Sequence, residues 1–293
     1  MTYTVKPLII KTKTNLHVGS GDMNYNIVDK TVQRDSITNV PIINASSLKG
    51  ALRNHYDEVM PDMQRLDKEA RDFIFGKEDN DTPSQGYVKF LDSYLLFLPL
   101  RAYSRPFYYV TSKANLLAFC AFYETLNYDM DALKEEVENL DDNTIFDTDT
   151  TEIEDVTCKK STHKTPELQA LFGEIDIAIF SSENFIDACE HLPIIARNKV
   201  ETKNAKGEPN NDSNLWYEEI VPRESIFYTA QLDYSVYGNR VLKPANYKLK
   251  TFYDVLTKDL IQIGANASVG FGLCRFSEIA LSANNSEDTQ NAK

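Results

Sequence analysis

The sequence has no long apolar run, no paired-cysteine motif and none of the short motifs that mark common hydrolases and nucleotide-binding proteins. No apolar stretch approaches the roughly 18 residues that a membrane-spanning helix needs, so we expect a cytoplasmic protein without a membrane partner. Motifs of the form G-x-S-x-G, H-E-x-x-H and G-x-x-x-x-G-K-[ST] are absent, which excludes the enzymes built on them. The cysteines lie far apart and form no C-x-x-C pair, which argues against a disulfide framework and a zinc knuckle: Cys120, Cys158, Cys189 and Cys274.

The composition is that of a globular protein whose charge is segregated along the chain. Of the 293 residues, 42% are hydrophobic and 11% are aromatic, far from the composition of disordered chains. A net charge of -13 would disfavour a polyanionic partner, because nucleic-acid affinity comes largely from Lys and Arg. Residues 129–155, however, hold twelve acidic residues and one basic residue, a local net of -11 that leaves only -2 for the rest. Basic residues collect in 1–53, 197–207 and 240–250, so nucleic-acid binding stays open.

Hydrophobic periodicity predicts strands and helices in the order β, α, β, β, α, β with long insertions between them. The first strand, within 3–19, has one polar face, and a loop longer than usual connections follows it. A helix capped by Ser46 or Ser47 comes next, with an apolar face of Leu48, Leu52, Tyr56 and Val59. Further strands are predicted at 87–100, at the end of 167–180, at 225–237 and at 272–281, and further helices at 113–128 and 246–264.

This order is typical of an α+β protein with an RRM-like or ferredoxin-like palm and helices on one face of its sheet. We predict a single domain over residues 1–293, with insertions at about 57–86 and 129–172. The polar stretch 197–219 predicts a long β-hairpin with Gly207 and Pro209 at its tip. The tail at 282–293 is predicted to be disordered.

Two segments carry side chains that are suited to a phosphodiester. IVDKTVQRD at 27–35 mixes Asp29 and Asp35 with basic residues, and a solvated loop is the alternative interpretation. In SSLKGALR, Lys49 and Arg53 share one face near a helix N-terminus, where an anion is favoured. Gly50 lowers helix stability, which fits a ligand that comes close to this turn.

Two further features are weaker. The loop GANASVGFGLCRF places Gly264, Gly270 and Gly272 where main-chain N–H groups can approach a phosphate, although a tight turn would use the same residues. His17 lies at a strand end before the long loop, where it could act as a general acid or base or simply form a hydrogen bond. No Cys and His pair has the ligand spacing of a structural metal site.

Taken together, five blocks resemble, in order and spacing, the RAMP proteins of CRISPR effector complexes: LHVGSG, IVDKTVQRD, VPIINASSLKGALR, LWYEEIVPRESIFY and GANASVGFGLCRF. LWYEE followed by P-x-x-x-x-F-Y points to the backbone subunits of the type III-B Cmr complex. The resemblance implies an RRM-like palm with a thumb hairpin at about 198–216. It also implies copies of the chain stacked along a CRISPR RNA beside other Cmr subunits.

The resemblance further implies a site at which target single-stranded RNA is cleaved at regular intervals. Asp29 of the V-D-x-x-x-Q-R pattern would lie beside a displaced nucleotide and act with a divalent metal, Mg²⁺ or Mn²⁺. RNA phosphate and water would complete the coordination, so we expect weak metal binding without RNA. The implied RNA contacts are Ser47, Lys49, Arg53, the main chain of Gly270 and Gly272, and, beside them, Gln33 and Arg34.

Three alternatives stay open. The chain could be a non-catalytic RNA-binding scaffold in which Asp29 pairs with Lys30 or Arg34. It could be a metal-independent RAMP endonuclease that processes CRISPR RNA through residues such as His17, or a backbone subunit of the related type III-A complex. The acidic stretch 129–155 is expected on the outer surface or against a neighbouring subunit, because it repels RNA.

Overall fold

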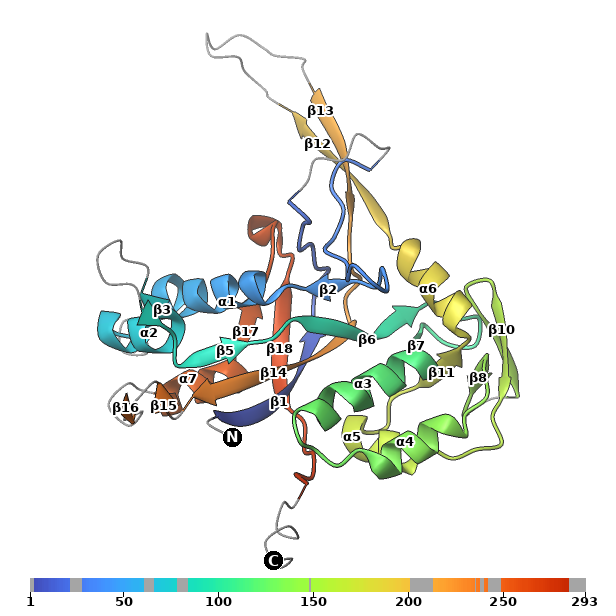
Figure 1. Cartoon of the computed structure of the whole chain (residues 1–293). Coiled ribbons are helices and arrows are strands. Elements are labelled where there is room, and N and C mark those ends of the chain that lie inside the picture. The colour runs from blue at the N-terminus through green and yellow to red at the C-terminus, as the bar shows by residue number, and fades with distance from the viewer. Residues whose placement is uncertain are drawn as a thin grey trace, which may run out of the picture.

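A mixed sheet of twelve strands runs through the molecule (Figure 1). The computed structural model describes residues 3–21, 28–60, 66–77, 84–147, 149–200, 213–234, 236–237, 240–241 and 249–284. The strand order is β17 (Leu260–Gln262), β18 (Leu273–Glu278), β1 (Tyr3–Thr12), β14 (Ile226–Tyr234), β6 (Ser93–Leu100), β7 (Tyr108–Ser112), β11 (Ile177–Phe180), β8 (Thr144–Ile145), β10 (Val156–Lys160) and β9 (Thr150–Ile153), with β2 (Ile42–Ile43) beside β6 and β5 (Val88–Phe90) beside β14. The predicted α+β class is confirmed.

The central strand β1 sends alternate side chains into two separate hydrophobic cores. Leu8 and Ile10 belong to one core, whereas Ile9 between them belongs to the other. β14 does the same with Phe227 and Tyr228. Because neighbouring side chains of a strand point to opposite faces, β1 is covered on both faces here and has no polar face of the predicted kind.

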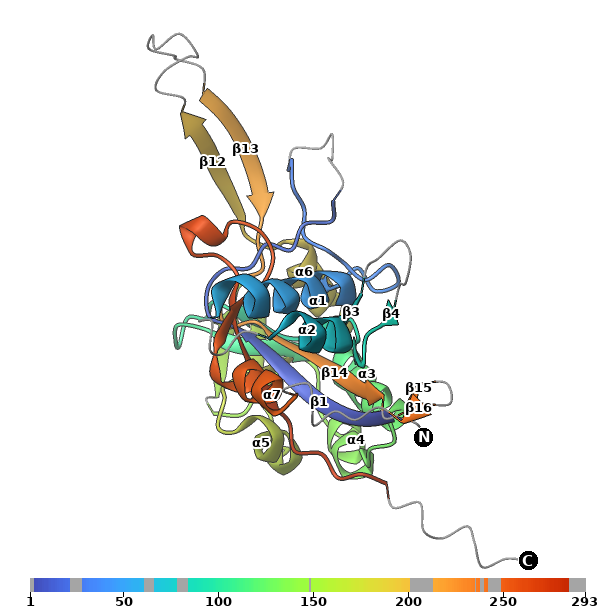
Figure 2. The same cartoon turned by 90° about the vertical axis from the view of Figure 1, so that its left-hand side faces the viewer.

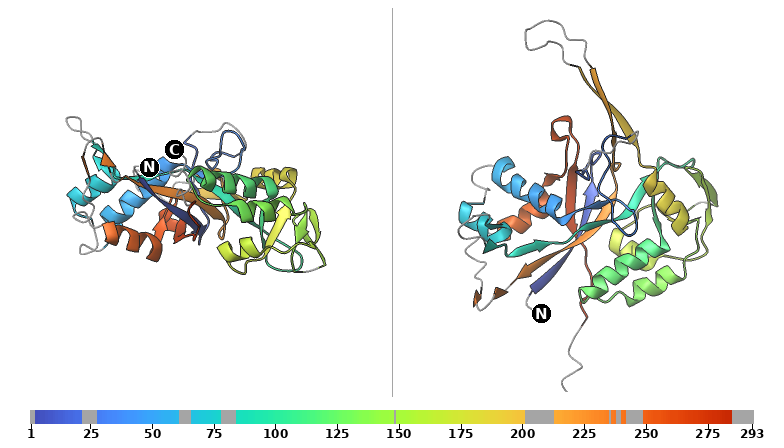
Figure 3. Two further views of the ribbon diagram at one scale, coloured as in Figure 1. Left: turned by 60° about the horizontal axis from the view of Figure 1, so that its bottom comes forward. Right: turned by 45° about the horizontal axis from the view of Figure 1, so that its top comes forward.

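Helices cover both faces of the sheet (Figure 3). One core receives side chains from α1 (Ala45–Asn54), α2 (Lys68–Phe75), α6 (Ser182–Glu190) and α7 (Leu249–Lys258). The other receives them from α3 (Lys113–Thr125), α4 (Asp131–Glu138) and α5 (Pro166–Phe172). The prediction of helices on one face is therefore wrong, because residues 113–172 add a second helical layer.

The acidic stretch 129–155 forms α4, which belongs to this second layer, and the strands β8 and β9 of the sheet. Its apolar side chains Leu133, Val137, Ile145 and Ile153 are buried, and most of its carboxylates are exposed. Figures 1 and 2 show α4 at the end of the molecule opposite the hairpin β12–β13. The carboxylates on α4 thus lie away from that hairpin, whereas Glu154 and Asp155 line a pocket together with Leu192 and Pro193, which directly precede β12.

Helix α1 begins differently from its prediction. Its N-cap is Asn44, whose side chain caps no N–H group. The N–H of Ala45 instead donates to Asp92 Oδ1 (2.6 Å), from the turn between β5 and β6. Ser46 and Ser47 lie inside the first helical turn, so the predicted cap is wrong and a carboxylate from another segment takes its place.

A π-helical turn at His55–Val59 follows α1 and changes the spacing of its apolar face. Leu48, Leu52 and Tyr56 are buried as predicted, whereas Val59 is 61% exposed. A π-turn accommodates more residues per turn than an α-helix, so a side chain spaced for an α-helix rotates away from the core.

The antiparallel strands β12 (Ile194–Val200) and β13 (Ser213–Glu219) form a hairpin that projects from the sheet (Figure 2). We call it the thumb hairpin. Its register pairs Ile194 with Glu219 at the root and Val200 with Ser213 further out. The stretch predicted as the thumb, 198–216, includes the outer part of both strands, and the predicted tip at Gly207 and Pro209 lies outside the described residues.

The remaining segments contain more structure than the sequence indicated. The predicted insertion at 57–86 includes α2, whose N-cap Asp67 accepts a hydrogen bond from Ala70 N (2.8 Å), and the short pair β3 (Gly76–Lys77) and β4 (Ser84–Gln85). The pair β15 (Val236–Tyr237) and β16 (Arg240–Val241) follows β14. The predicted helix at 246–264 ends at Lys258 and gives way to β17.

The predicted disordered tail at 282–293 starts with bonded residues. Asp129 N donates to Ser282 O (2.8 Å) and Asn284 N donates to Asn127 O (3.0 Å), while 285–293 lie outside the described residues. No helix in the described ranges is long and apolar enough to cross a membrane.

Candidate nucleic-acid interface

Four segments that are distant in the sequence meet at the root of the thumb hairpin (Figures 1 and 2). They are residues 16–20 after β1, the loop 28–38, the Gly-rich loop 264–272 and the root itself. Backbone hydrogen bonds join them: Glu219 N donates to Lys30 O (2.9 Å), and Ala265 N donates to His17 O (2.8 Å). The structure thus brings together four of the five blocks that the sequence shows separately.

Asp29 is held by the backbone of the thumb hairpin. Its N–H donates to Tyr217 O (3.1 Å), and its Oδ2 accepts from Tyr217 N (2.8 Å). The residue is exposed, and the ion pairs of the described residues join its carboxylate to neither Lys30 nor Arg34. The arrangement fixes the position of Asp29 and leaves its negative charge without a salt-bridge partner among those residues.

The two basic residues pair instead with adjacent glutamates of β13. Lys30 Nζ donates to Glu218 Oε1 (2.8 Å), and the Arg34 guanidinium donates to Glu219 Oε1. Burial raises the pKa of Glu218, but hydrogen bonds from Lys30, Trp216, Arg197 and Asn266 outweigh it and lower that pKa to about 2. The sequence alone indicates no role for either glutamate, although both belong to the LWYEE segment that resembles the Cmr backbone subunits.

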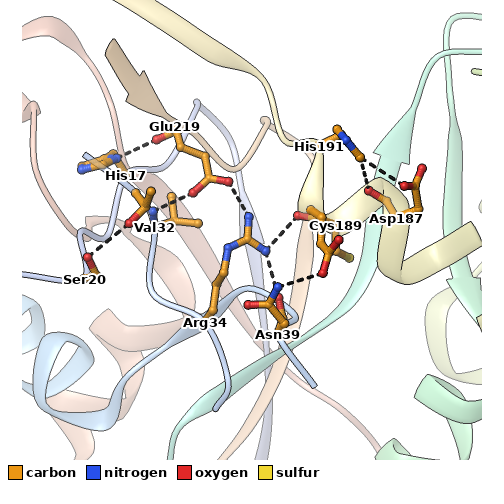
Figure 4. Close-up of polar contacts among 11 residues, drawn as sticks. His17, Ser20, Val32, Arg34, Asn39, Asp187, Cys189, His191 and Glu219 are labelled. Atoms are coloured by element: carbon orange, nitrogen blue, oxygen red, sulfur yellow. Dashed lines mark hydrogen bonds and ion pairs between the residues drawn. The ribbon is translucent and has the colours of Figure 1, made fainter. Parts of the chain in front are cut away.

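The side chains of Gln33 and Arg34 form hydrogen bonds within the protein, and Figure 4 shows those of Arg34. Arg34 Nη1 donates to the carbonyls of Asn39 and Cys189, both at 2.9 Å. Gln33 Nε2 donates to Ser47 Oγ (3.1 Å), and Gln33 Oε1 accepts from the N–H that precedes α1. Both side chains brace the loop 28–38 from within, and a contact between them and RNA stays a prediction.

His17 faces the same hollow as Asp29. The ring is 3% exposed, and its Nδ1 lies 2.7 Å from Glu219 O. Because a carbonyl only accepts, Nδ1 carries the proton, and Nε2 of the neutral ring keeps its lone pair. A pocket of about 290 Å³ is lined by His17, Gly19, Ser20, Gly21, Asp29, Lys30 and Thr31. Figure 4 shows the ring and its bond to Glu219.

Helix α1 presents the predicted cations at the edge of this region. Lys49 and Arg53 are half-buried and one helical turn apart. Gly50 is exposed, and a Cβ built there would meet nothing within 4 Å in the described structure. The surface beside the two cations is therefore open at this position.

The Gly-rich loop needs its glycines for its own fold. Gly264 and Gly272 have positive φ angles, and a Cβ on Gly272 would lie 2.0 Å from Ile263 O. Gly272 N donates to Asn15 O (2.8 Å), and Gly270 N donates to Ala267 O (2.9 Å). Neither of the N–H groups expected to hold phosphate is free in this structure, so such a contact would require the loop to rearrange.

The described residues do not form a metal site by themselves. They contain no group of three or more His, Cys, Asp or Glu side chains placed to hold an ion. Asp29 offers one exposed carboxylate, which fits a cation that RNA oxygens help to hold and does not fit a preformed protein cage.

The fold and this constellation define a palm-and-thumb protein of the RAMP class. A family model described as the RAMP superfamily matches residues 9–275, and the chain belongs to this family. The Cmr endoribonuclease Cmr4 of Pyrococcus furiosus is 28% identical over 286 residues, which cover 90% of this chain and 92% of that protein.

Solved structures agree in fold. A type III-B Cmr-beta complex bound to cognate target RNA contains a chain with a TM-score of 0.74 and 20% identity, covering 95% of this chain and 98% of that one. Oligomeric Cmr4 from Pyrococcus furiosus has a TM-score of 0.67 and 22% identity, covering 95% of this chain and 99% of that one.

Proposed function

We propose that this chain is a backbone subunit of a type III-B CRISPR effector complex and that it cleaves guide-complementary target RNA with Asp29. The observation that carries the assignment is the placement of Asp29. Its exposed carboxylate is held by Tyr217 N and forms an ion pair with neither Lys30 nor Arg34. It lines one pocket together with His17. A relative that matches 90% of the chain is named as a Cmr endoribonuclease, which supports the same activity here.

The chemistry is transesterification within the target strand. A nucleotide displaced from the guide duplex is freed from A-form geometry, so its 2′-OH can line up behind the adjacent phosphate. The 2′-oxygen attacks phosphorus, the P–O5′ bond breaks, and the leaving O5′ takes a proton from water, so the products are a 2′,3′-cyclic phosphate and a 5′-OH. Asp29 is placed to accept the 2′-OH proton, and His17 Nε2 is a second acceptor on the wall of the same pocket.

A divalent cation, Mg²⁺ or Mn²⁺, is part of the proposal. Asp29 is its protein ligand, and RNA phosphate and water complete the coordination. When bound, the cation stabilises the negative charge that develops on the phosphate. Since one carboxylate holds such an ion weakly, we expect measurable metal binding only when guide and target RNA are present.

RNA binding is assigned to the cations of α1. Lys49 and Arg53 contact guide phosphates, which fixes the position of the guide without reading its bases. The other proposed partners are target single-stranded RNA, other Cmr subunits and further copies of this chain. The likeness in fold to a chain of a target-bound Cmr complex and to oligomeric Cmr4 supports these partners.

One cleavage assay tests the function. We expect Asp29→Asn, which keeps an acceptor for Tyr217 N, to slow target cleavage in the assembled complex about 100-fold while guide and target binding persist. Asp35→Asn is the matched control in the same loop, because Asp35 Oδ1 only caps the turn by accepting from Ile37 N, Thr38 N and Thr38 Oγ1. It should cleave like the unmodified protein.

Two outcomes would favour the alternatives. Cleavage that continues in Asp29→Asn would assign the reaction to another subunit and leave this chain as a scaffold. Cleavage that survives EDTA, and is lost on His17→Ala, would favour the metal-independent reaction instead.

A further inference from the structure

The carboxylate of Glu218 is the junction of the segments around Asp29. It is 1% exposed and accepts four hydrogen bonds. Lys30 Nζ (2.8 Å) and Trp216 Nε1 (2.7 Å) donate to Oε1, and Arg197 Nε (2.9 Å) and Asn266 Nδ2 (2.8 Å) donate to Oε2. Both oxygens therefore have two donors each, which satisfies a buried carboxylate.

The four donors come from the loop of Asp29, the two strands of the thumb hairpin and the Gly-rich loop. Lys30 directly follows Asp29, Arg197 lies on β12, Trp216 lies on β13, and Asn266 lies in the Gly-rich loop. Ring contacts reinforce the same junction, because Lys30 Nζ lies 5.2 Å from the Trp216 ring centroid. One side chain thus links the loop of Asp29, both thumb strands and the Gly-rich loop.

Glu218 also borders the residue that holds Asp29. Tyr217, which exchanges two hydrogen bonds with Asp29, precedes Glu218 on β13. A parallel bridge pairs Lys30 with Glu218, and Glu219 N donates to Lys30 O (2.9 Å). Any shift of Lys30 relative to β13 would therefore move Asp29 relative to the thumb hairpin.

We propose that Glu218 is a positioning residue, which holds Asp29 and the segments around it in the arrangement that target cleavage requires. The proposal rests on the function proposed above. Glu218 acts through Lys30 and the backbone of β13, and it does not touch the scissile phosphate. Its charge is matched by two cations, so replacing it with a neutral side chain leaves Lys30 and Arg197 without their counter-ion.

The titration of Glu218 agrees with a fixed, permanently ionised support. Burial raises its pKa, yet the four donors lower it to about 2, so the carboxylate stays charged at any pH at which RNA cleavage is assayed. Titration of Glu218 should therefore not change the cleavage rate anywhere in the pH profile.

The test is Glu218→Gln in the complex assembled with guide RNA. We expect the single-turnover rate at saturating target to fall about 100-fold, the effect of a misplacement near 1 Å, while guide and target affinities stay unchanged. The pH profile should keep its shape and drop by the same factor at every pH. Glu218→Asp, which keeps the charge, should recover part of the rate.

Glu224→Gln is the matched control. Glu224 also joins two lysines and a tyrosine, namely Lys11, Lys13 and Tyr109, but it shares no partner with Glu218. We expect the control to cleave at the unmodified rate. An equal loss in Glu224→Gln, a wild-type rate in Glu218→Gln, or a loss that vanishes at saturating target would each overturn the proposal.

Two further variants remove ambiguity. Where Glu218→Gln does not assemble, Trp216→Phe decides, because it keeps a ring beside Lys30 and removes one donor to Glu218. A rate loss at unchanged affinity supports the proposal, and a wild-type rate overturns it. Asp29→Asn runs alongside: if it cleaves normally the proposed function fails, whereas an inactive Asp29→Asn with a fully active Glu218→Gln refutes only the positioning role.

Discussion

Two adjacent glutamates of β13, Glu218 and Glu219, bind different residues of the loop 28–38 at the root of the thumb hairpin. Side chains of a strand alternate between its faces, so Glu218 and Glu219 meet different partners. Glu218 binds Lys30, and Glu219 binds Arg34 and the N–H of Val32 (2.9 Å). The basic residues of the loop 28–38 are therefore neutralised by the thumb hairpin, and Asp29 keeps its charge for the pocket that it shares with His17.

The lowered pKa of Glu218 makes a prediction about stability. Folding lowers this pKa to about 2, below the unfolded value of roughly 4.3, so the unfolded chain binds more protons between these two values. The stabilisation from Glu218 is thus fully present above the unfolded pKa and is lost as the pH falls toward the folded pKa. We expect Glu218→Gln to lower the free energy of unfolding by about 3 kcal/mol at neutral pH.

Denaturant unfolding at several pH values measures this effect. The difference between the unmodified chain and Glu218→Gln should shrink below about pH 4 and approach zero near the folded pKa. A difference that stays constant into acid would contradict the ionised, four-fold bonded state of the carboxylate.

At single positions, the sequence points to Asp29 and His17 as candidates, whereas it gives no sign of the role that we propose for Glu218. Asp29 can be found from the sequence because it belongs to a short charged motif, IVDKTVQRD. Trp216 is two residues away on the same strand, but the other partners of Glu218 are at positions 30, 197 and 266, and no local spacing connects residues so far apart in the chain. The same distance explains why Arg34 was expected beside RNA, when its guanidinium is used by Glu219, Asn39 and Cys189.

The glycine inside helix α1, Gly50, leads to a prediction about stability and guide binding. Gly50 is inside the helix with open space around it, and Gly in a helix costs about 1 kcal/mol relative to Ala. We expect Gly50→Ala to raise the free energy of unfolding by about that amount. It should also weaken guide binding, since the added methyl group would stand beside Lys49 and Arg53, where we propose that the guide backbone binds.

Thermal unfolding and guide-binding titrations check both halves of this expectation. Gly272→Ala is the contrasting variant and should destabilise the fold, because its Cβ would lie 2.0 Å from Ile263 O. A Gly50→Ala chain that is more stable and binds guide normally would show that RNA does not approach this turn.

Whether a segment forms a helix or a strand could be predicted from the sequence better than the residues at which it begins and ends. Apolar spacing found α1 and α3 because local periodicity decides whether a helix forms. The start of α1 was misplaced, since Asp92 from another segment holds the first N–H, and Val59 was misplaced by the π-turn. α2 was missed because its eight residues are too short for a clear period.

Across the whole molecule, the acidic helix α4 lies at the end opposite the thumb hairpin. Helices α3, α4 and α5 build the second helical layer, and α4, which carries part of the acidic stretch, lies opposite the thumb hairpin in Figures 1 and 2. Charge repulsion falls off over a Debye length of about 8 Å in physiological salt, so carboxylates on α4 act weakly on RNA bound at the hairpin. The net charge of -13 therefore says little about the RNA-binding face.

The salt dependence of guide binding tests this separation. Each phosphate contact removed lowers the slope of log affinity against log salt by about 0.7 to 1, so Lys49→Gln with Arg53→Gln should lower the slope by up to about 2. Glu135→Gln with Glu138→Gln removes two exposed charges from α4 and should leave the slope unchanged. Binding of guide RNA by the purified chain over a series of salt concentrations gives both slopes. Effects of equal size and opposite direction in the two pairs would mean that guide affinity follows net charge alone, and that α1 is not the surface on which the phosphates lie.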